Sequence, residues 1–311
     1  MARTPTPYHG NPPRPAADPA GSLKSKVKGY GRRPKRSLGQ VFLIEASIRQ
    51  KIIDSASLAP EDIVVEIGPG TGALTLELAR RARRLYALEI DKDLIGYLRT
   101  SANLPPNVRL VCIDALRFDF QRLQRVAGQR LKIVGNLPYS ISTPLLFHFV
   151  EQRKALELLV LMLQKEVAQR LTAAPRTKAY GVLTVMTRAF MDVSLERLVR
   201  RQCFYPVPKV DSALVRVVPR QTPMVPEAHR EVFSSVVEAA FSTRRKTLFN
   251  ALRSSGRFDL PADRLADLLA TLQIDPARRA ETLELEEFVL LAKGIQAARE
   301  QDIDKRSGFV P

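Results

Sequence analysis

A glycine-rich turn between a buried strand and a helix limits the fold of this chain more than any other stretch. Residues 62–67 form an apolar run that predicts a strand, and the turn Gly68-Pro69-Gly70-Thr71-Gly72 follows at once. Apolar residues at helical spacing then cover 74–82, and a second strand is predicted at 85–88. Glycines let a ligand approach the backbone, and the helix start adds a positive dipole end. The pattern predicts a nucleoside-binding βαβ unit in an α/β fold.

An acid at the end of the second strand supports a nucleoside ligand. Glu89 lies twenty-one residues after Gly68, a spacing at which a carboxylate can accept hydrogen bonds from ribose hydroxyls. Gly68, Gly70 and Ala73 also satisfy the dinucleotide pattern G-x-G-x-x-G/A. A nicotinamide cofactor is therefore an alternative at this point.

Two further acids favour S-adenosylmethionine over a nicotinamide cofactor. Glu66 lies two residues before the first glycine of the turn, where it suits a cofactor that carries an ammonium group rather than a pyrophosphate. Asp114 follows a predicted strand at 108–113, and a carboxylate at that place can accept a hydrogen bond from an adenine amine. The same side chain is also suited to cap a short helix.

The tetrapeptide Asn136-Leu137-Pro138-Tyr139 is the predicted catalytic loop. It follows an apolar strand at 131–135, and ligands of open α/β sheets bind at such strand ends. Asn136 and the backbone of Leu137 offer carbonyl oxygens, Pro138 stiffens the turn, and Tyr139 offers a ring for stacking. This set fits the planar amine of an adenine. An ordinary strand-to-helix loop is the alternative, because Asn and Pro are common in loops.

The remaining pattern predicts a seven-stranded sheet. Further strands are expected at 158–163, 193–201 and 211–218. A short link joins the last two, which suggests an antiparallel pair. A seven-stranded sheet with one reversed strand differs from the dinucleotide fold and favours a Rossmann-like class I methyltransferase. From Arg220 onward the apolar spacing is purely helical, which predicts a small C-terminal all-helical domain.

The charge of the chain indicates a polyanionic partner. Lys and Arg number 49 against 32 Asp and Glu, which gives a net charge of +17 and a pI near 10.3. Such a balance indicates nucleic acid first and an anionic membrane second. No apolar run approaches the ~20 residues that span a bilayer, so an integral membrane protein is excluded. Cys112 and Cys203 lie among apolar residues and suggest buried thiols in a reducing cytoplasm, and no Cys/His cluster indicates a metal site.

Four segments are expected along the chain. Residues 1–34 form a basic, Pro-rich leader, 35–219 a methyltransferase domain, 220–300 a helical RNA-binding domain, and 301–311 a flexible tail. Residues 1–36 carry seven prolines and nine Lys or Arg against one acid, so the leader is expected to be disordered. It is either a solvated extension or a basic arm that adds non-specific phosphate affinity.

Two basic stretches are candidates for RNA contact. Arg244, Arg245 and Lys246 place three positive charges at one helix junction. Lys209 lies in a stiff, aromatic connection between the last two strands. A solvated helix face is the alternative, but the net charge favours contact with RNA phosphates.

Taken together, these motifs resemble those of the KsgA/RsmA-type ribosomal RNA adenine dimethyltransferases, from about Lys35 to about Leu291. The motifs are specific for this family when taken together. The matching stretches are 37–40 with 42–43, 66–72, 136–139, 163–167, 178–181, Phe204 with Pro206 and 208–212, and 244–248.

The resemblance implies an activity and a set of contacts. The family substrate is two adjacent adenosines in a hairpin loop near the 3′ end of small-subunit (16S) rRNA, each of which receives two methyl groups during subunit biogenesis. Phe204 is expected to close the second face of the base. The family often has Asn or His where this chain has Val41, so only a backbone contact is expected there. Contacts with S-adenosylmethionine are expected at Val41, Leu43, Gly68, Gly70, Glu89, Asp114 and Asn136.

The implied partner is small-subunit rRNA or the 30S pre-ribosomal subunit, bound by a cytoplasmic monomer without a metal. Two alternatives stay open. One is a methyltransferase that modifies one adenine of large-subunit rRNA and confers antibiotic resistance. The other is a non-catalytic RNA-binding assembly factor with the same fold.

Overall fold

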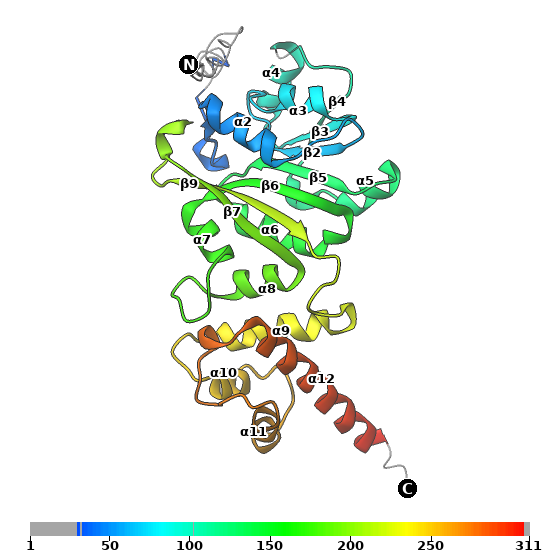
Figure 1. The fold of residues 1–311 in the computed structure, drawn as a ribbon, viewed down its shortest axis with the longest axis vertical. Helices are drawn as coiled ribbons and strands as arrows, with labels where there is room; N and C mark the ends of the chain where they lie inside the picture. The colour runs from blue at the N-terminus through cyan, green and yellow to red at the C-terminus, as the bar shows by residue number, and fades with distance from the viewer. Residues whose placement is uncertain (1–29, 32, 102, 308–311) are drawn as a thin grey trace, which may run out of the picture.

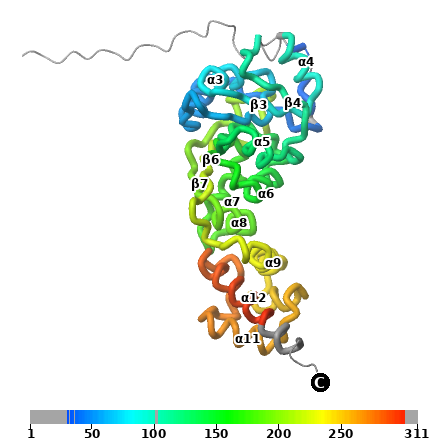
Figure 2. The backbone as a smooth tube through the Cα atoms, turned by 90° about the vertical axis from the view of Figure 1, so that its right-hand side faces the viewer, coloured from blue at the N-terminus to red at the C-terminus, as the bar shows by residue number. Residues whose placement is uncertain are grey.

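The computed structural model describes residues 30–31, 33–101 and 103–307. These residues form an elongated molecule in which a layered α/β part lies at one end and a cluster of helices at the other (Figures 1 and 2). Most of the predicted leader lies outside the described residues. Tyr30, near its end, is nevertheless buried and packs edge-on against Tyr97, so the ordered part begins earlier than predicted.

Within the described residues, seven strands form one sheet, as predicted. The order is β4-β3-β2-β5-β6-β9-β7, and only β9 runs antiparallel to its neighbours. A separate two-stranded pair joins β1 (Phe42–Leu43) to β8 (Phe204–Tyr205). The strands of the large sheet are β2 (Ile63–Ile67), β3 (Arg84–Glu89), β4 (Val108–Cys112), β5 (Leu131–Asn136), β6 (Leu156–Gln164), β7 (Met191–Val199) and β9 (Ser212–Pro219).

Helices cover both faces of the sheet, because its central strands are apolar on both sides. In β2, Val64 belongs to one hydrophobic cluster, whereas Val65 belongs to the larger cluster. The cluster of Val64 includes residues of α2 (Ala46–Ser55) and α3 (Thr75–Arg81). The larger cluster, that of Val65, includes residues of α5 (Phe120–Ala127), α6 (Ser142–Glu151), α7 (Lys165–Leu171) and α8 (Val182–Phe190). The helix α4 (Lys92–Ser101) packs on β3 and β4.

The helical part shares its hydrophobic core with the sheet. Phe190 of α8 packs edge-on against Phe233, with 6.1 Å between ring centroids, and the buried Arg153 guanidinium lies 4.4 Å from the centroid of the Phe190 ring. This continuity fixes the helices against the α/β part. They are α9 (Arg230–Phe241), α10 (Leu248–Ser254), α11 (Ala262–Thr271) and α12 (Leu285–Ser307).

Two predictions need correction here. The helix α12 continues to Ser307, so most of the segment 301–311 expected as a flexible tail is helical. Cys112 is exposed and Cys203 is half-buried, so neither is the buried thiol that was predicted. Cys112 is exposed because β4, the strand that it ends, lies at the edge of the sheet.

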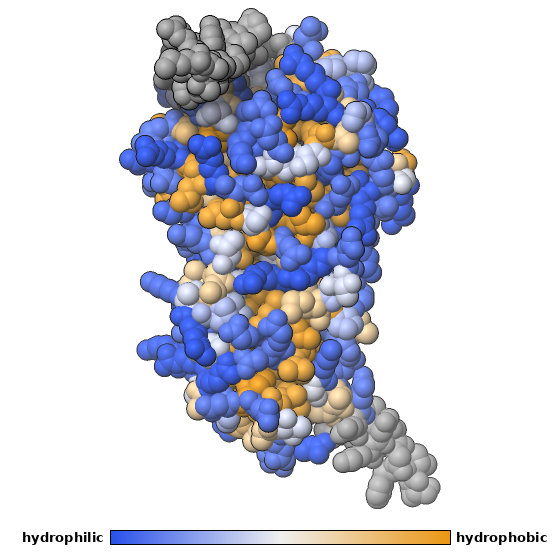
Figure 3. All heavy atoms as spheres, viewed as in Figure 1, coloured by the Kyte–Doolittle hydropathy of each residue, from blue (hydrophilic) through white to orange (hydrophobic). Residues whose placement is uncertain are grey.

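The face of the molecule drawn in Figure 3 is mostly polar. Hydrophilic side chains predominate on the face drawn in Figure 3, and hydrophobic ones show between them over the sheet and the lower helices. The edge strand β7 exposes Leu195 and Leu198 but separates them with Glu196 and Arg197, which discourages pairing with another strand. Among the helices of the described chain, none is both long and apolar enough to cross a bilayer.

Candidate active site

A cavity of about 750 Å³ opens at the carboxyl ends of β2, β3 and β5. The predicted catalytic loop contributes Leu137, Pro138 and Tyr139 to its wall. The structure therefore brings the glycine turn and the catalytic loop together, although they lie more than sixty residues apart in the sequence. Six predicted cofactor residues also line it: Val41, Leu43, Gly68, Gly70, Glu89 and Asn136.

A second hollow of about 600 Å³ adjoins the first and contains the seventh predicted cofactor residue, Asp114. The two spaces share Leu38, Gly68, Glu89 and Pro138 as walls. One Asp114 carboxylate oxygen accepts from the Leu116 backbone N–H at 3.0 Å, so the helix-cap role is real. The helix cap uses one of the two Asp114 carboxylate oxygens, and Asp114 still lines the second hollow.

The side chain of Asn136 has a defined orientation. Its amide nitrogen donates to the Val41 backbone carbonyl at 2.8 Å. Because that carbonyl can only accept, the nitrogen must face it, and the amide oxygen Oδ1 is left for another partner. The Val41 carbonyl is thus used by Asn136, and the backbone contact of Val41 with the methyl donor stays a prediction.

The rest of the catalytic loop is held on both sides. The hydroxyls of Tyr139 and Ser212 share a hydrogen bond of 2.9 Å, which ties the loop to the start of β9. The Pro138 carbonyl accepts from the Ile141 N–H and the Ser142 hydroxyl, so the turn after the loop is fixed. The ring of Tyr139 is thus positioned before any ligand binds.

The glycine turn needs glycines at two positions in particular. Gly68 has φ +68° and Gly70 has φ +57°, in the left-handed region that side chains rarely adopt. A Cβ atom at Gly70 would also lie 3.0 Å from the Phe42 ring. Phe42 is the first residue of β1, so this close approach packs the N-terminal segment onto the turn.

Three buried polar side chains next to the glycine turn carry atoms without a protein partner in the described structure. They are Glu66 Oε2, Thr71 Oγ1 and Thr75 Oγ1. Glu66 and Thr71 line the cavity. Burial raises the pKa of Glu66 from 4.5 to about 8, so this environment favours the protonated carboxyl at neutral pH. Unpaired buried polar atoms are rare in proteins, and those of Glu66 and Thr71 lie in the wall of the cavity, which indicates that a polar ligand satisfies them. Thr75 does not line the cavity, and its hydroxyl lies close enough to Glu66 to act as a hydrogen-bond partner of that carboxyl.

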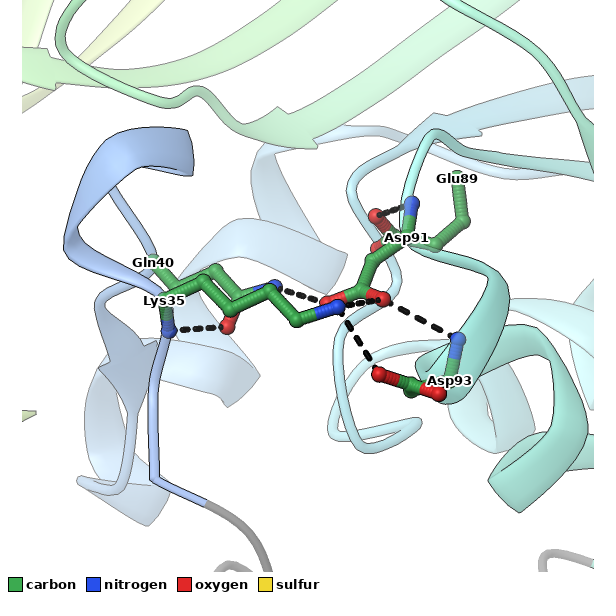
Figure 4. Close-up of polar contacts among 5 residues, drawn as sticks. All are labelled: Lys35, Gln40, Glu89, Asp91 and Asp93. Atoms are coloured by element: carbon green, nitrogen blue, oxygen red, sulfur yellow. Dashed lines mark hydrogen bonds and ion pairs between the residues drawn. The ribbon is translucent and has the colours of Figure 1, made fainter.

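The ribose candidate Glu89 is held by a network that sequence reasoning did not find (Figure 4). Glu89 Oε1 accepts from the Asp91 backbone N–H at 3.0 Å. The Asp91 carboxylate, whose side chain is fully buried, accepts from Lys35 Nζ at 2.6 Å and from Gln40 Nε2 at 2.7 Å. Lys35 also pairs with Asp93 at 2.8 Å. The only sign of this network in the sequence is Asp91, an acid two residues after Glu89. Its partners Lys35 and Gln40 are distant in the sequence.

This network fastens the segment 35–43 over the cavity. Gln40 lines the cavity directly, as do its neighbours from Leu38 to Leu43. Burial by itself would raise the pKa of Asp91, but the hydrogen bonds from Lys35 and Gln40 outweigh it and the pKa lies below its usual value. Asp91 therefore stays ionised and keeps the segment, which we call the N-terminal strap, in place.

Replacing Lys35 by methionine should loosen the N-terminal strap without unfolding the protein. We expect about a three- to tenfold weaker affinity for S-adenosylmethionine or S-adenosylhomocysteine in a calorimetric titration, because Lys35 is partly exposed and the pair is screened by solvent. Lys92→Met is the matched control, since Lys92 is exposed at the start of α4 and outside the network. Equal affinities for the two variants would show that the strap does not depend on Lys35.

One predicted catalytic residue is not at the site. Phe204 is only 1 % exposed, and its ring belongs to the cluster around Leu43, Val160 and Leu214. Phe204 does not line the cavity in this arrangement, so closure of the second face of the base by its ring stays a prediction. Pairing of β8 with β1 turns the ring into the core, and the sequence does not show that pairing.

The predicted RNA-binding residues are exposed, but not all are free. Arg244, Arg245 and Lys246 lie between α9 and α10, as expected. Arg244 is partly committed, because it pairs with Glu281 at 3.2 Å and donates to the Lys178 carbonyl at 2.7 Å. Lys209 lies in the loop before β9, close to the catalytic loop rather than to the helical part.

The strand order, the reversed β9 and a cavity built from a glycine turn define a Rossmann-like class I methyltransferase. The sequence profile of the family "Ribosomal RNA adenine dimethylase" matches residues 31–297. The chain therefore belongs to the ribosomal RNA adenine dimethylase family. The nicotinamide alternative has no support in this family.

Individual relatives agree with the family. The "Ribosomal RNA small subunit methyltransferase A" of Geobacter metallireducens is 44% identical over 272 residues, 87% of this chain and 98% of that protein. The protein of the same name from Geobacillus kaustophilus is 41% identical, over 88% of this chain and 95% of its own length.

Solved structures give the same fold. A dimethyladenosine transferase from Plasmodium falciparum is 28% identical with a TM-score of 0.68, covering 79% of this chain and 94% of that one. The 23S rRNA methyltransferase ErmE is 29% identical with a TM-score of 0.63, covering 82% of this chain and 99% of that one.

Proposed function

We propose that this protein transfers methyl groups from S-adenosylmethionine to the exocyclic amines of two adjacent adenosines, in a hairpin loop near the 3′ end of small-subunit rRNA. The 30S pre-ribosomal subunit is then the substrate, and the protein acts as a cytoplasmic monomer in ribosome biogenesis. The observation that carries the proposal is the Asn136 side chain. Its nitrogen is bound to Val41, so its oxygen is available beside the ring of Tyr139.

The cavity fits the chemistry of the proposed methyl donor. Glu66 has an unpaired buried oxygen suited to an ammonium group, and Thr71 has an unpaired hydroxyl in the wall of the same cavity. Glu89 would accept from ribose hydroxyls and Asp114 from the adenine amine of the donor. When bound, S-adenosylmethionine supplies a methyl group on a positively charged sulfur. Cofactor contacts at Val41, Leu43, Gly68, Gly70 and Asn136 complete the proposed set.

The catalytic loop then prepares the target amine. Asn136 Oδ1 and the Leu137 backbone carbonyl would each accept one N–H of the adenine amine, which draws its lone pair out of the ring. Pro138 keeps the turn rigid, and Tyr139 stacks on the base, which contributes about 1–3 kcal/mol. Alignment supplies most of the rate acceleration. The proton leaves once the nitrogen is cationic, so a strong general base is not required.

The target adenosines must leave their stack to reach the cavity. Unstacking costs least in a single-stranded loop, which agrees with the hairpin substrate. Arg245 and Lys246, with Arg244 shared between Glu281 and solvent, are proposed to contact RNA phosphates from the helical part.

Mapping the methylated nucleotides tests this function. The full chain is incubated with S-adenosylmethionine and unmodified small or large ribosomal subunits, and the rRNA is analysed by primer extension and mass spectrometry. We expect two adjacent dimethylated adenosines near the 3′ end of the small-subunit rRNA. Modification of one adenosine in large-subunit rRNA would support the ErmE-like alternative, and RNA binding without methyl transfer would support the non-catalytic one.

A further inference from the structure

A basic hollow lies at the start of β9, the strand to which the catalytic loop is tied, and only its residue Lys209 is among the predicted RNA-binding residues. It has a volume of about 840 Å³ and lies between the start of α7 and the loop before β9. Arg201 and Lys209 are exposed, and Lys165 is half-buried. The side chains that matter for its charge are Lys165, Glu166, Arg201, Lys209 and Asp211.

The acids of the basic hollow are already engaged, whereas its cations are not. Glu166 pairs with Arg170 at 2.5 Å, one turn further along α7. Asp211 Oδ1 accepts from the Arg201 backbone N–H at 2.9 Å. Across the described part of the chain, no ion pair involves the side chain of Lys165, Arg201 or Lys209. The hollow therefore offers three cationic groups to an anion, against one carboxylate, Asp211, that no ion pair among the described residues neutralises.

The basic hollow is joined to the proposed adenine site by short contacts. The Tyr139 hydroxyl is bonded to Ser212, the residue after Asp211. The Lys165 backbone N–H donates to the Asp211 carbonyl at 3.0 Å, which sets the start of α7 against the same strand end. The basic hollow and the Tyr139 ring therefore lie on either side of the same strand start, Asp211-Ser212.

We propose that Lys165, Arg201 and Lys209 bind the phosphodiester that adjoins the target adenosine. This rests on the proposed function, because it takes the flipped adenosine as the occupant of the cavity. The cations neutralise a backbone phosphate and so fix the nucleotide at the mouth of the cavity. The helical part holds more distant phosphates, whereas the basic hollow sets the position of the reacting nucleotide.

The test uses the full chain and an RNA hairpin that carries the two adjacent adenosines. The triple variant Lys165→Ala, Arg201→Ala, Lys209→Ala is compared with Arg125→Ala. Arg125 is exposed near the end of α5, at the opposite edge of the sheet, and lines neither the cavity nor the basic hollow. The dissociation constant is measured at several salt concentrations. The slope of log affinity against log salt should fall by about 0.7–1 in the triple variant and stay unchanged in Arg125→Ala.

A neutral linkage in the RNA identifies the phosphate. Hairpins with one methylphosphonate, 5′ or 3′ of either target adenosine, are bound to wild type and to the triple variant. One of these linkages should weaken binding by wild type but not by the triple variant, because both changes remove the same contact. An unchanged salt slope, or equal losses for both proteins at every linkage, would overturn the proposal.

Two controls separate this proposal from the proposed function. The triple variant should bind S-adenosylhomocysteine as wild type does and melt at the same temperature. Methyl transfer by wild type to the small subunit tests the function independently of the hollow. Absence of that transfer would defeat the proposed function, whereas the RNA-binding comparison would still decide whether the hollow holds a phosphate.

Discussion

Replacing Asn136 by alanine is expected to lower the rate of methyl transfer by about a hundred- to a thousandfold, the loss seen when one catalytic hydrogen-bonding group is removed. The amide oxygen is the acceptor that the target amine needs, and alanine offers none. Single-turnover assays on unmodified small subunits measure the rate. Near-normal transfer by this variant would contradict the role given to Asn136.

A matched control separates catalysis from folding. Asn107 is also an asparagine whose amide donates to backbone carbonyls, those of Ala79 and Ala82 at 2.8 and 3.0 Å. It precedes β4, so it lies at the amino edge of the sheet, away from the cavity. Asn107→Ala and Asn136→Ala should each lose about 1 kcal/mol of stability per hydrogen bond, but only Asn136→Ala should lose transfer.

Replacing Glu66 by glutamine is expected to weaken binding of S-adenosylmethionine by about ten- to a hundredfold, the effect of losing a charged hydrogen bond. Because the pKa of Glu66 is about 8 in the free protein, the ammonium of the donor must drive off its proton on binding. Wild type should therefore release close to one proton per site at pH 7. Calorimetry in buffers of different ionisation heat measures this release, and Glu66→Gln should abolish it.

The same substitution should change the stability of the free protein in the opposite direction. The unfolded chain loses the Glu66 proton near pH 4.5, whereas the folded chain keeps it until about pH 8. The contribution of Glu66 to stability is thus full below pH 4.5 and is lost as the pH rises through 8. Glu66→Gln does not lose this stability, so its free energy of unfolding in denaturant should exceed that of wild type by a few kcal/mol at pH 9. If the difference in unfolding free energy between Glu66→Gln and wild type were the same at pH 5 and at pH 9, that result would contradict the burial of an ionisable carboxyl at Glu66.

The sheet could be predicted because each strand carries its own signal. Apolar runs such as 131–135 and 158–163 are buried on both faces, and their periodicity does not depend on distant residues. The antiparallel pairing of β9 with β7 could be predicted because only a short link joins the two strands. The catalytic loop and glycine turn met as expected because carboxyl ends of parallel strands share one edge.

What could not be predicted depends on pairings between distant segments. The orientation of Asn136 is set by Val41, ninety-five residues earlier, and the network of Glu89 depends on Lys35. Phe204 was expected at the cavity and is in the core, because β8 pairs with β1. No local pattern encodes these contacts, so the sequence identified the chemical groups but not what holds or hides them.

The most direct test of the account is a crystal structure of the full chain with S-adenosylhomocysteine. We expect the amino group at Glu66, the ribose at Glu89, and the sulfur facing the space between Asn136 Oδ1 and the ring of Tyr139. A sulfur that faces away from residues 136–139, with those residues still ordered as described, would contradict the assignment of the catalytic loop.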